Sequence, residues 1–309
     1  MLVFEGIFPI LALALAGYLS ARTGFLKESE YLAIARFTFN LVIPCLLFIN
    51  MVHADIPDNF GLDFLLAFYL PILLVYLSAL RLARHVFKAN ARLQAVMAIG
   101  ATYSNTTVVG IPLVLQTLGS ASLLPLLMII ATQNLVLFSV ATVFAEREQF
   151  DMRTLARSLL RLLRQLLSSP LTTSLIAGLA FNLLEIGLYR PIDLSLSLMS
   201  EAAIPTALFV LGTSLHQYQV GRQLPAALMI TAMKLIVLPL LVWVSMYQVF
   251  DIDPLWAKTA LLGSAMPVGI SAYVFAIRYN TGQPAVAAAS VISTLLSLIP
   301  LTLILLWIS

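Results

Sequence analysis

Long apolar segments separated by short charged loops constrain this 309-residue chain more than any other feature. A helix that crosses a bilayer needs about 20 predominantly apolar residues. Hydrophobic residues make up 61% of the chain and charged residues 10%, a composition unlike that of soluble domains. The sequence therefore predicts an all-α polytopic protein embedded in a lipid bilayer. Ten spanning helices are expected, with the approximate limits 3–21, 31–52, 62–83, 93–118, 121–145, 170–189, 195–217, 224–248, 255–278 and 284–308.

The placement of charge predicts the topology. Lys and Arg gather in alternate loops, and such loops lie in the cytoplasm. Both termini are then expected outside the cytoplasm. The linker 147–168 carries arginines on one predicted helical face, so we expect it along the inner membrane surface. The residues behind this assignment are Arg22, Lys27, Arg81, Arg84, Lys88, Arg92, Arg147, Arg153, Arg157, Arg161, Arg164, Arg222 and Arg278 inside, against Asp55, Asp58, Asp251 and Asp253 outside, with Arg190 as an exception.

Short matching stretches indicate an internal repeat. The run 43–48 (IPCLLF) matches 204–209 (IPTALF), and Gly17 and Gly178 stand at equal distances before the two prolines. A second pair of Leu-Pro runs begins at Leu70 and Leu238. Because each half holds five helices, the second half must be inverted in the membrane. The predicted organisation is a first repeat over 1–146, the linker over 147–168 and an inverted repeat over 169–309.

Two of the predicted helices contain polar and helix-breaking residues at membrane depth. The fourth includes the run 103–112 (YSNTTVVGIP), and the ninth includes 263–271 (GSAMPVGIS). Proline removes a backbone donor and clashes with the preceding turn. Paired interruptions at corresponding places in two halves indicate a binding site near the bilayer midplane. We expect the broken helices 4 and 9 to cross, with half-helix N-termini that favour an anion.

The run 105–113 (NTTVVGIPL) resembles the Asn-Thr-x-x-x-Gly-Ile-Pro-Leu stretch of the auxin efflux carrier family, whose bacterial members include carriers of malonate and other organic anions. The C-terminal region from Ala265 through Ser297 is also similar to the bacterial branch, so the resemblance covers essentially the whole chain. Plant members usually have Pro where this chain has Ser104. The break is therefore expected nearer Gly110 and Pro112.

The resemblance implies an architecture and a mechanism. Helices 1, 2, 6 and 7 are expected to form a scaffold that makes a homodimer. Helices 3–5 and 8–10 are expected to form a transport domain that moves as an elevator in the bacterial inner membrane. Auxin itself is a poor candidate substrate, because the long cytosolic loop of many plant members is absent.

Candidate binding residues follow from polarity at membrane depth. Asn105 stands at the break and offers an uncharged donor. Lys234, about ten residues into helix 8, is expected to hold a substrate carboxylate, to pair with Glu201 or to release a proton. Gln133 is favoured over its neighbour Asn134 as the side chain facing the site. The full set expected to bind substrate is Asn105, Thr106, Gly110, Pro112, Gln133, Lys234, Pro267 and Val268.

The leading function is secondary transport of a small organic anion. The alternative is a transporter or exchanger coupled to Na⁺ or H⁺, of the bile-acid carrier or antiporter type, with the ion at the crossing. A membrane enzyme is disfavoured because no helix carries His, Asp and Ser or Cys near one depth, and a channel fits paired broken helices less well. No cofactor, metal site or nucleic-acid partner is expected, and no phosphate-binding GxxxxGK[ST] motif is present.

Overall fold

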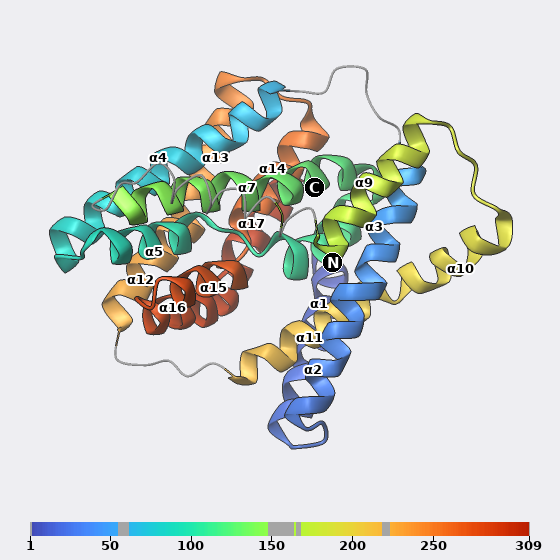
Figure 1. Cartoon of the computed structure of the whole chain (residues 1–309), viewed down its shortest axis with the longest axis horizontal. Coiled ribbons are helices and arrows are strands. Elements are labelled where there is room, and N and C mark those ends of the chain that lie inside the picture. The colour runs from blue at the N-terminus through green and yellow to red at the C-terminus, as the bar shows by residue number, and fades with distance from the viewer. Residues whose placement is uncertain (1, 55–61, 148–163, 165–167, 218–222, 309) are drawn as a thin grey trace. The chain divides into compact units, whose positions relative to one another are not determined.

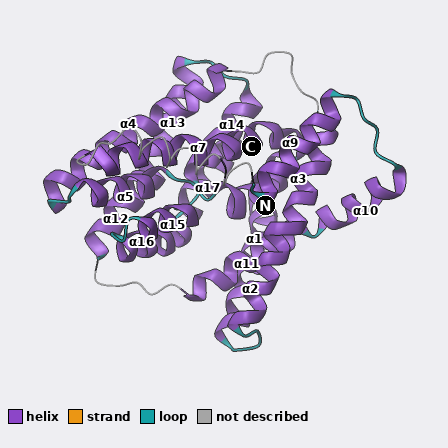
Figure 2. Ribbon diagram, in the orientation of Figure 1, coloured by secondary structure: helices purple, strands orange, loops and turns teal. Residues whose placement is uncertain are grey.

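The computed structural model describes residues 2–54, 62–147, 164, 168–217 and 223–308. All regular structure in these ranges is helical, and loops connect the helices (Figure 2). Five helices are long and apolar enough to cross a membrane, and a sixth is added if α16 and α17, bent by 41°, count as one span. The expectation of an all-α multi-pass membrane protein is confirmed, whereas the ten-span arrangement stays a prediction.

The helices of the described residues carry the labels of Figure 1. The elements η1, η2, η5 and η6 are π-turns, and η3 is a 3₁₀ turn. In chain order they are α1 (Leu2–Arg22), α2 (Glu28–Phe37), η1 (Thr38–Val42), α3 (Ile43–Val52), α4 (Leu62–Phe87), α5 (Ala91–Thr102), η2 (Thr106–Gly110), α6 (Ile111–Leu118), η3 (Ser120–Ser122), α7 (Leu123–Glu146), α9 (Pro170–Leu183), α10 (Arg190–Glu201), α11 (Ala203–Gln217), α12 (Leu224–Ala232), η5 (Met233–Val237), α13 (Leu238–Val244), η6 (Ser245–Val249), α14 (Pro254–Ala265), α15 (Ile270–Arg278), α16 (Gln283–Leu296) and α17 (Leu298–Ile308).

Three of the π-turns end two residues before a proline. The turns η1, η2 and η5 precede Pro44, Pro112 and Pro239. A proline inside a helix lacks the N–H donor and its ring crowds the carbonyl four residues earlier. A π-turn widens the helix at that point and so relieves the crowding. These three prolines therefore reshape their helices without stopping them.

The chain divides into two compact units. The first comprises Met1–Asp58, Ile111–Leu127 and Gln165–Gln217, and the second comprises Asn59–Gly110, Met128–Arg164 and Tyr218–Ser309. The linker expected at 147–168 lies almost entirely outside the described residues. The second unit holds both non-helical interruptions, at 103–105 and 266–269.

In the first unit, α1 packs against α11 and α3 packs against α9 (Figure 1). Two glycines permit these close approaches. A Cβ on Gly17 would lie 2.0 Å from the carbonyl oxygen of Phe209, and a Cβ on Gly178 would lie 2.7 Å from that of Phe48. The sequence repeat aligns Gly17 with Gly178 and Phe48 with Phe209. Each glycine therefore contacts the phenylalanine of the other half.

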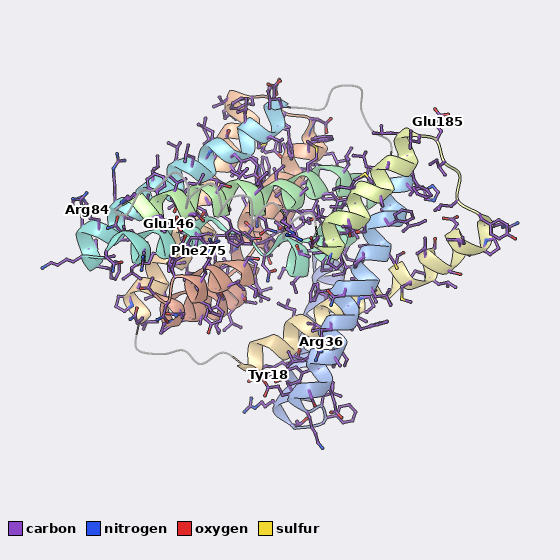
Figure 3. All side chains as sticks on the ribbon, in the orientation of Figure 1. Tyr18, Arg36, Arg84, Glu146, Glu185 and Phe275 are labelled. Atoms are coloured by element: carbon purple, nitrogen blue, oxygen red, sulfur yellow. The ribbon has the colours of Figure 1, made fainter. Side chains whose placement is uncertain are left out.

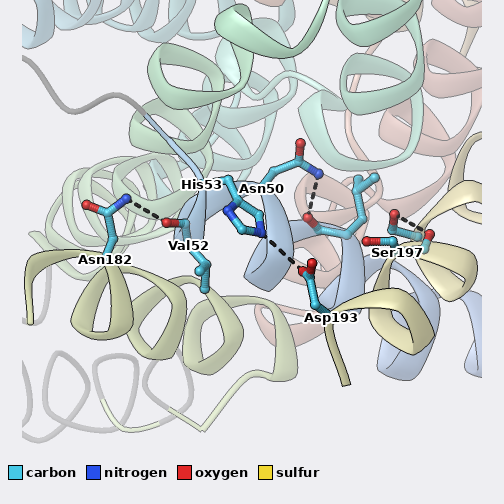
Figure 4. A network of polar contacts seen from close by, with 8 residues as sticks. Asn50, Val52, His53, Asn182, Asp193 and Ser197 are labelled. Carbon is cyan, nitrogen blue, oxygen red and sulfur yellow. Dashed lines mark hydrogen bonds and ion pairs between the residues drawn. The ribbon is translucent and has the colours of Figure 1, made fainter. Parts of the chain in front are cut away.

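A polar cluster at the end of α3 also belongs to the first unit (Figure 4). The Asn182 side chain donates to the carbonyl oxygens of Met51, Val52 and Ala54, at 3.1, 2.8 and 2.9 Å. The imidazole of His53 lies 3.1 Å from the carboxylate of Asp193. Carbonyl groups at a helix C-terminus have no intrahelical partner. Asn182, a residue of α9, therefore supplies hydrogen bonds to the free carbonyls at the end of α3.

The second unit is built around a core of small and aromatic side chains. The helices α4, α5, α12 and α16 supply most of it, and α15 lies beside α16 (Figure 1). Alanines that are fully buried, such as Ala95, Ala260 and Ala288, let these helices approach closely. This core holds the ends of the interrupted helices in place.

Candidate functional site

The first interruption lies between α5 and η2, at Tyr103, Ser104 and Asn105. The expectation that it lies nearer Gly110 and Pro112 is wrong. Pro112 is the second residue of α6, and the π-turn η2 ahead of it accommodates its ring. Gly110 closes that π-turn at the boundary of the second unit, and Pro112 belongs to the first unit. A proline was therefore not needed to break the helix at Ser104.

The second interruption lies between α14 and α15, at Met266–Gly269, within the stretch that the sequence indicates. The two interruptions run antiparallel and form one isolated bridge between Ser104 and Val268. The Asn105 amide donates to the Pro267 carbonyl at 2.9 Å, and the Gly269 amide donates to the Tyr103 carbonyl at 3.0 Å. The predicted crossing of the broken helices is thus present within one unit.

Side chains from two further helices secure this crossing. Gln133 of α7 donates to the Ser104 carbonyl at 2.9 Å, and its neighbour Asn134 accepts a hydrogen bond from the Tyr103 hydroxyl. Ser293 of α16 accepts from the Val268 amide at 2.9 Å. Both residues of the Gln-Asn pair therefore reach the same interruption, although the sequence favoured Gln133 alone. Gln133 and Ser293 hold the backbone at the crossing, and Asn134 holds the Tyr103 side chain.

Tyr103 is a residue of the site to which sequence reasoning assigned no role. Its ring stacks on Phe138 at 5.7 Å between centroids, Phe138 stacks on Phe275 at 5.7 Å, and Phe275 contacts Tyr279 at 4.7 Å. The Tyr279 hydroxyl donates to Glu146 at 3.0 Å; Glu146 and Phe275 are labelled in Figure 3. A row of rings thus connects the crossing to the end of α7. The sequence signal was an aromatic residue directly before a polar run.

Lys234 is fully buried inside the π-turn η5, and its amino group donates to the Ser264 carbonyl in the last turn of α14. Carbonyls in that turn lack intrahelical partners and form the negative end of the helix dipole. Lys234 thus has a backbone partner within its own unit, and its pairing with Glu201, an exposed residue of the first unit, stays a prediction. The lysine satisfies a half-helix C-terminus beside the crossing.

The carbonyl groups at the crossing are largely occupied, whereas several donors are not. Tyr103, Ser104, Ser264 and Pro267 all have their carbonyl oxygens bonded, as described above. The first amides of η2, from Thr106 onward, have no intrahelical acceptor because they begin a helix. Asn105 is 8% exposed, and in the described part of the chain no partner binds its carboxamide. The crossing therefore offers donors at two half-helix N-termini, at Thr106 and at Ile270.

The described residues contain no group of three or more His, Cys, Asp or Glu side chains placed to hold a metal ion. Among the described residues, the side chains that bond the crossing are neutral apart from Lys234. Its electrostatics come from backbone dipoles and from one lysine, which is an arrangement suited to an anionic group.

Comparison with known proteins places the chain in a family. The family described as "Membrane transport protein" matches residues 2–305. A protein of Rhizobium meliloti (strain 1021) named "Putative malonate transporter" is 26% identical over 301 residues, covering 96% of this chain and 92% of that protein. An "Uncharacterized transporter" of Methanothermobacter thermautotrophicus is 23% identical over 311 residues, covering 97% and 96%. The resemblance seen in the sequence is confirmed: the chain belongs to the membrane transport protein family and is a membrane transporter, not an enzyme.

Proposed function

We propose that this protein is a secondary transporter of small organic anions and that a substrate carboxylate binds at the crossing of the interrupted helices. One observation carries the proposal: the carbonyls at the crossing are bonded within the protein, whereas N–H groups and the Asn105 carboxamide are left available. An anion that leaves water needs donors already in place. The residues that make up the proposed site are Asn105, Thr106, Gly110, Gln133, Lys234, Pro267 and Val268, with Pro112 two residues after Gly110 along the chain.

These residues have different roles within the proposal. Asn105 and the amides from Thr106 onward bind the carboxylate. Gln133, Pro267 and Val268 hold the interrupted backbone, as their hydrogen bonds suggest. Lys234, when protonated, contributes positive potential and cancels the dipole of α14 near the site. Gly110 and Pro112 shape the helix that begins at Thr106.

Malonate is the first substrate to test, because a relative that covers nearly the whole chain is named for it. A dicarboxylate also matches the geometry in the second unit, where two half-helix N-termini begin on either side of one bridge. Each N-terminus suits one carboxylate. We therefore expect short dicarboxylates to bind more tightly than monocarboxylates of the same length.

The proposed mechanism is an elevator, with ten spans arranged as two inverted repeats in the inner membrane of a bacterium. The first unit gathers helices of the expected scaffold, and the second unit gathers both interrupted stretches. The exchanged contacts of Gly17 with Phe209 and of Gly178 with Phe48 support an inverted repeat. A homodimer formed through the scaffold helices is part of the same proposal.

A cation at the crossing is the alternative, and it fits the geometry less well. A cation needs free oxygen ligands, whereas four carbonyls here already accept hydrogen bonds. Coupling to Na⁺ or H⁺ elsewhere is compatible with an anion site. Uptake measured with Na⁺ and pH gradients imposed separately distinguishes coupled transport from uniport.

The test of the anion site is Asn105→Ala, measured as equilibrium binding of radiolabelled malonate to purified protein and as uptake into proteoliposomes. A hydrogen bond to a charged group contributes about 1.5–3 kcal/mol. We expect affinity to fall by roughly ten- to a hundredfold. The control is Asn50→Ala, because the Asn50 side chain donates to the Leu46 carbonyl of its own helix in the first unit. Unchanged affinity in a folded Asn105→Ala protein moves the site away from the crossing.

A further inference from the structure

The second unit contains a large apolar groove that the anion site does not use. One wall follows the helix from Leu228 to Trp243, and the other follows α17 to Trp307, with Leu261 of α14 between them. The groove encloses about 700 Å³. Thr231 supplies the one polar side chain among these lining residues of the described chain. Such a lining offers nothing to a small carboxylate, so the groove has a different occupant.

The length of the groove suits a hydrocarbon chain. The 15 residue steps from Leu228 to Trp243 correspond to about 22 Å of helix. This length exceeds half of the hydrocarbon core of about 30 Å, which is the reach of one acyl chain.

One end of the groove has the features of a membrane–water interface. The rings of Trp243, Tyr247 and Trp307 pack together, with centroids 5.2–6.5 Å apart. Trp and Tyr prefer the level of the lipid headgroups. The Tyr247 hydroxyl is buried and has no hydrogen-bond partner among the residues described. This end of the groove therefore carries the aromatic residues expected at the level of the headgroups.

A positive charge lies at the same end. Lys258 stands one turn before Leu261 on α14, so both side chains share a helix face. Its amino group donates to the Ile308 carbonyl at 3.1 Å, next to Trp307 of the groove. One hydrogen bond leaves the other donors of a lysine available. The nearby Asp253 carboxylate accepts from the Leu255 and Trp256 amides and so belongs to the helix cap.

We propose that the groove binds an anionic phospholipid, with its acyl chains along α12, α13 and α17 and its phosphate at Lys258. The apolar walls and the length of the groove match an acyl chain, and the aromatic end and the adjacent lysine match a headgroup. The bound lipid fills the bend between α16 and α17, where the chain turns by 41°. This inference is independent of the substrate carried at the crossing.

The test uses the chain's own tryptophans as reporters. The sequence contains three tryptophans, and Trp256→Phe leaves Trp243 and Trp307, which line the groove. Phosphatidylglycerol with dibrominated acyl chains is titrated into the purified full-length variant in detergent, and phosphatidylcholine with the same chains is titrated in parallel. We expect saturable quenching, with phosphatidylglycerol binding about two- to fivefold more tightly, as for an exposed ion pair.

Two further variants separate the parts of the proposal. Lys258→Gln removes the preference for phosphatidylglycerol, whereas Arg278→Gln, a matched loss of charge outside the groove, keeps it. Ala232→Phe narrows the groove from its exposed rim and reduces the maximal quenching. The proposal is overturned if quenching rises in proportion to the brominated lipid without saturating and is the same in the Ala232→Phe variant. The proposal is also overturned if Trp243 and Trp307 become protected from quenching as the protein concentration rises, because a second copy of the chain then occupies the groove.

Discussion

Gly269 offers the sharpest test of the crossing, because a single methyl group added there meets the other interruption. A Cβ at this position would lie 2.6 and 2.8 Å from ring carbons of Tyr103 and 3.0 Å from the Ser104 carbonyl oxygen. The backbone of Gly269 has φ −76° and ψ 148°, which any residue adopts. The effect of Gly269→Ala is therefore steric and is confined to the contact between the two broken helices.

The size of the effect follows from how firmly Tyr103 is held. Its hydroxyl bonds Asn134 and its ring stacks on Phe138, so the ring cannot turn away freely. Overpacking of this kind typically costs about 1–3 kcal/mol. If that strain falls on the binding-competent geometry, malonate affinity drops by about 5- to 150-fold.

The matched control is Gly263→Ala, six residues earlier, in the last turn of α14. A Cβ there would lie 3.8 Å from Ile129 and 3.9 Å from Thr106, which are ordinary contacts. We expect binding close to that of the parent protein. The assay is equilibrium binding of radiolabelled malonate, with thermal unfolding of each variant measured in the same detergent.

A double-mutant cycle with Tyr103→Leu locates the clash. Removing the ring should make the added methyl of Gly269→Ala less harmful, with a coupling of at least about 0.5 kcal/mol, as expected for residues in contact. The reasoning is refuted if Gly269→Ala binds as well as Gly263→Ala. It is also refuted if the losses of Gly269→Ala and Tyr103→Leu simply add, because the methyl then acts elsewhere.

Two further predictions concern the buried lysine and the topology. Lys234→Met removes the donor to Ser264, so stability should fall by about 1–3 kcal/mol because a buried carbonyl loses its partner. Malonate affinity should fall about tenfold, or about 1.4 kcal/mol, whereas binding of neutral analogues should not change. Equal losses for both classes of ligand contradict an electrostatic role. The topology is tested with a membrane-impermeant thiol reagent added from outside in a Cys45→Ala background. It should label Gly187→Cys, which has open space around its Cα, but not Arg84→Cys, which is exposed near the end of α4 (Figure 3). The reverse pattern contradicts the positive-inside assignment.

The apolar segments, the two interrupted stretches and the family resemblance were all readable from the sequence. Periodic runs of about 20 apolar residues have few alternatives to membrane helices, because backbone groups in lipid must bond within their own segment. Polar residues followed by Gly and Pro inside such a run are costly unless they meet protein or water. The sequence therefore determined that the chain is a multi-pass helical transporter with two breaks and located the second break correctly.

The position of the first break depended on tertiary structure. Pro112 was expected to mark it, yet a π-turn absorbs that proline, and the helix stops at Tyr103 where Pro267 and Gly269 supply backbone partners. Those partners lie more than 160 residues away along the chain. Local propensity cannot report a hydrogen bond whose other half comes from another helix.

The roles of single polar residues were also decided by the fold. The sequence identified Gln133 and Lys234 as polar at membrane depth but could not tell that both bind carbonyls at the crossing. It favoured Gln133 over Asn134, whereas both reach the same interruption: Gln133 binds the Ser104 carbonyl and Asn134 binds the Tyr103 hydroxyl. Residue type and spacing determine which groups must find partners in a membrane, and only the packing of distant helices decides which partner each of them finds.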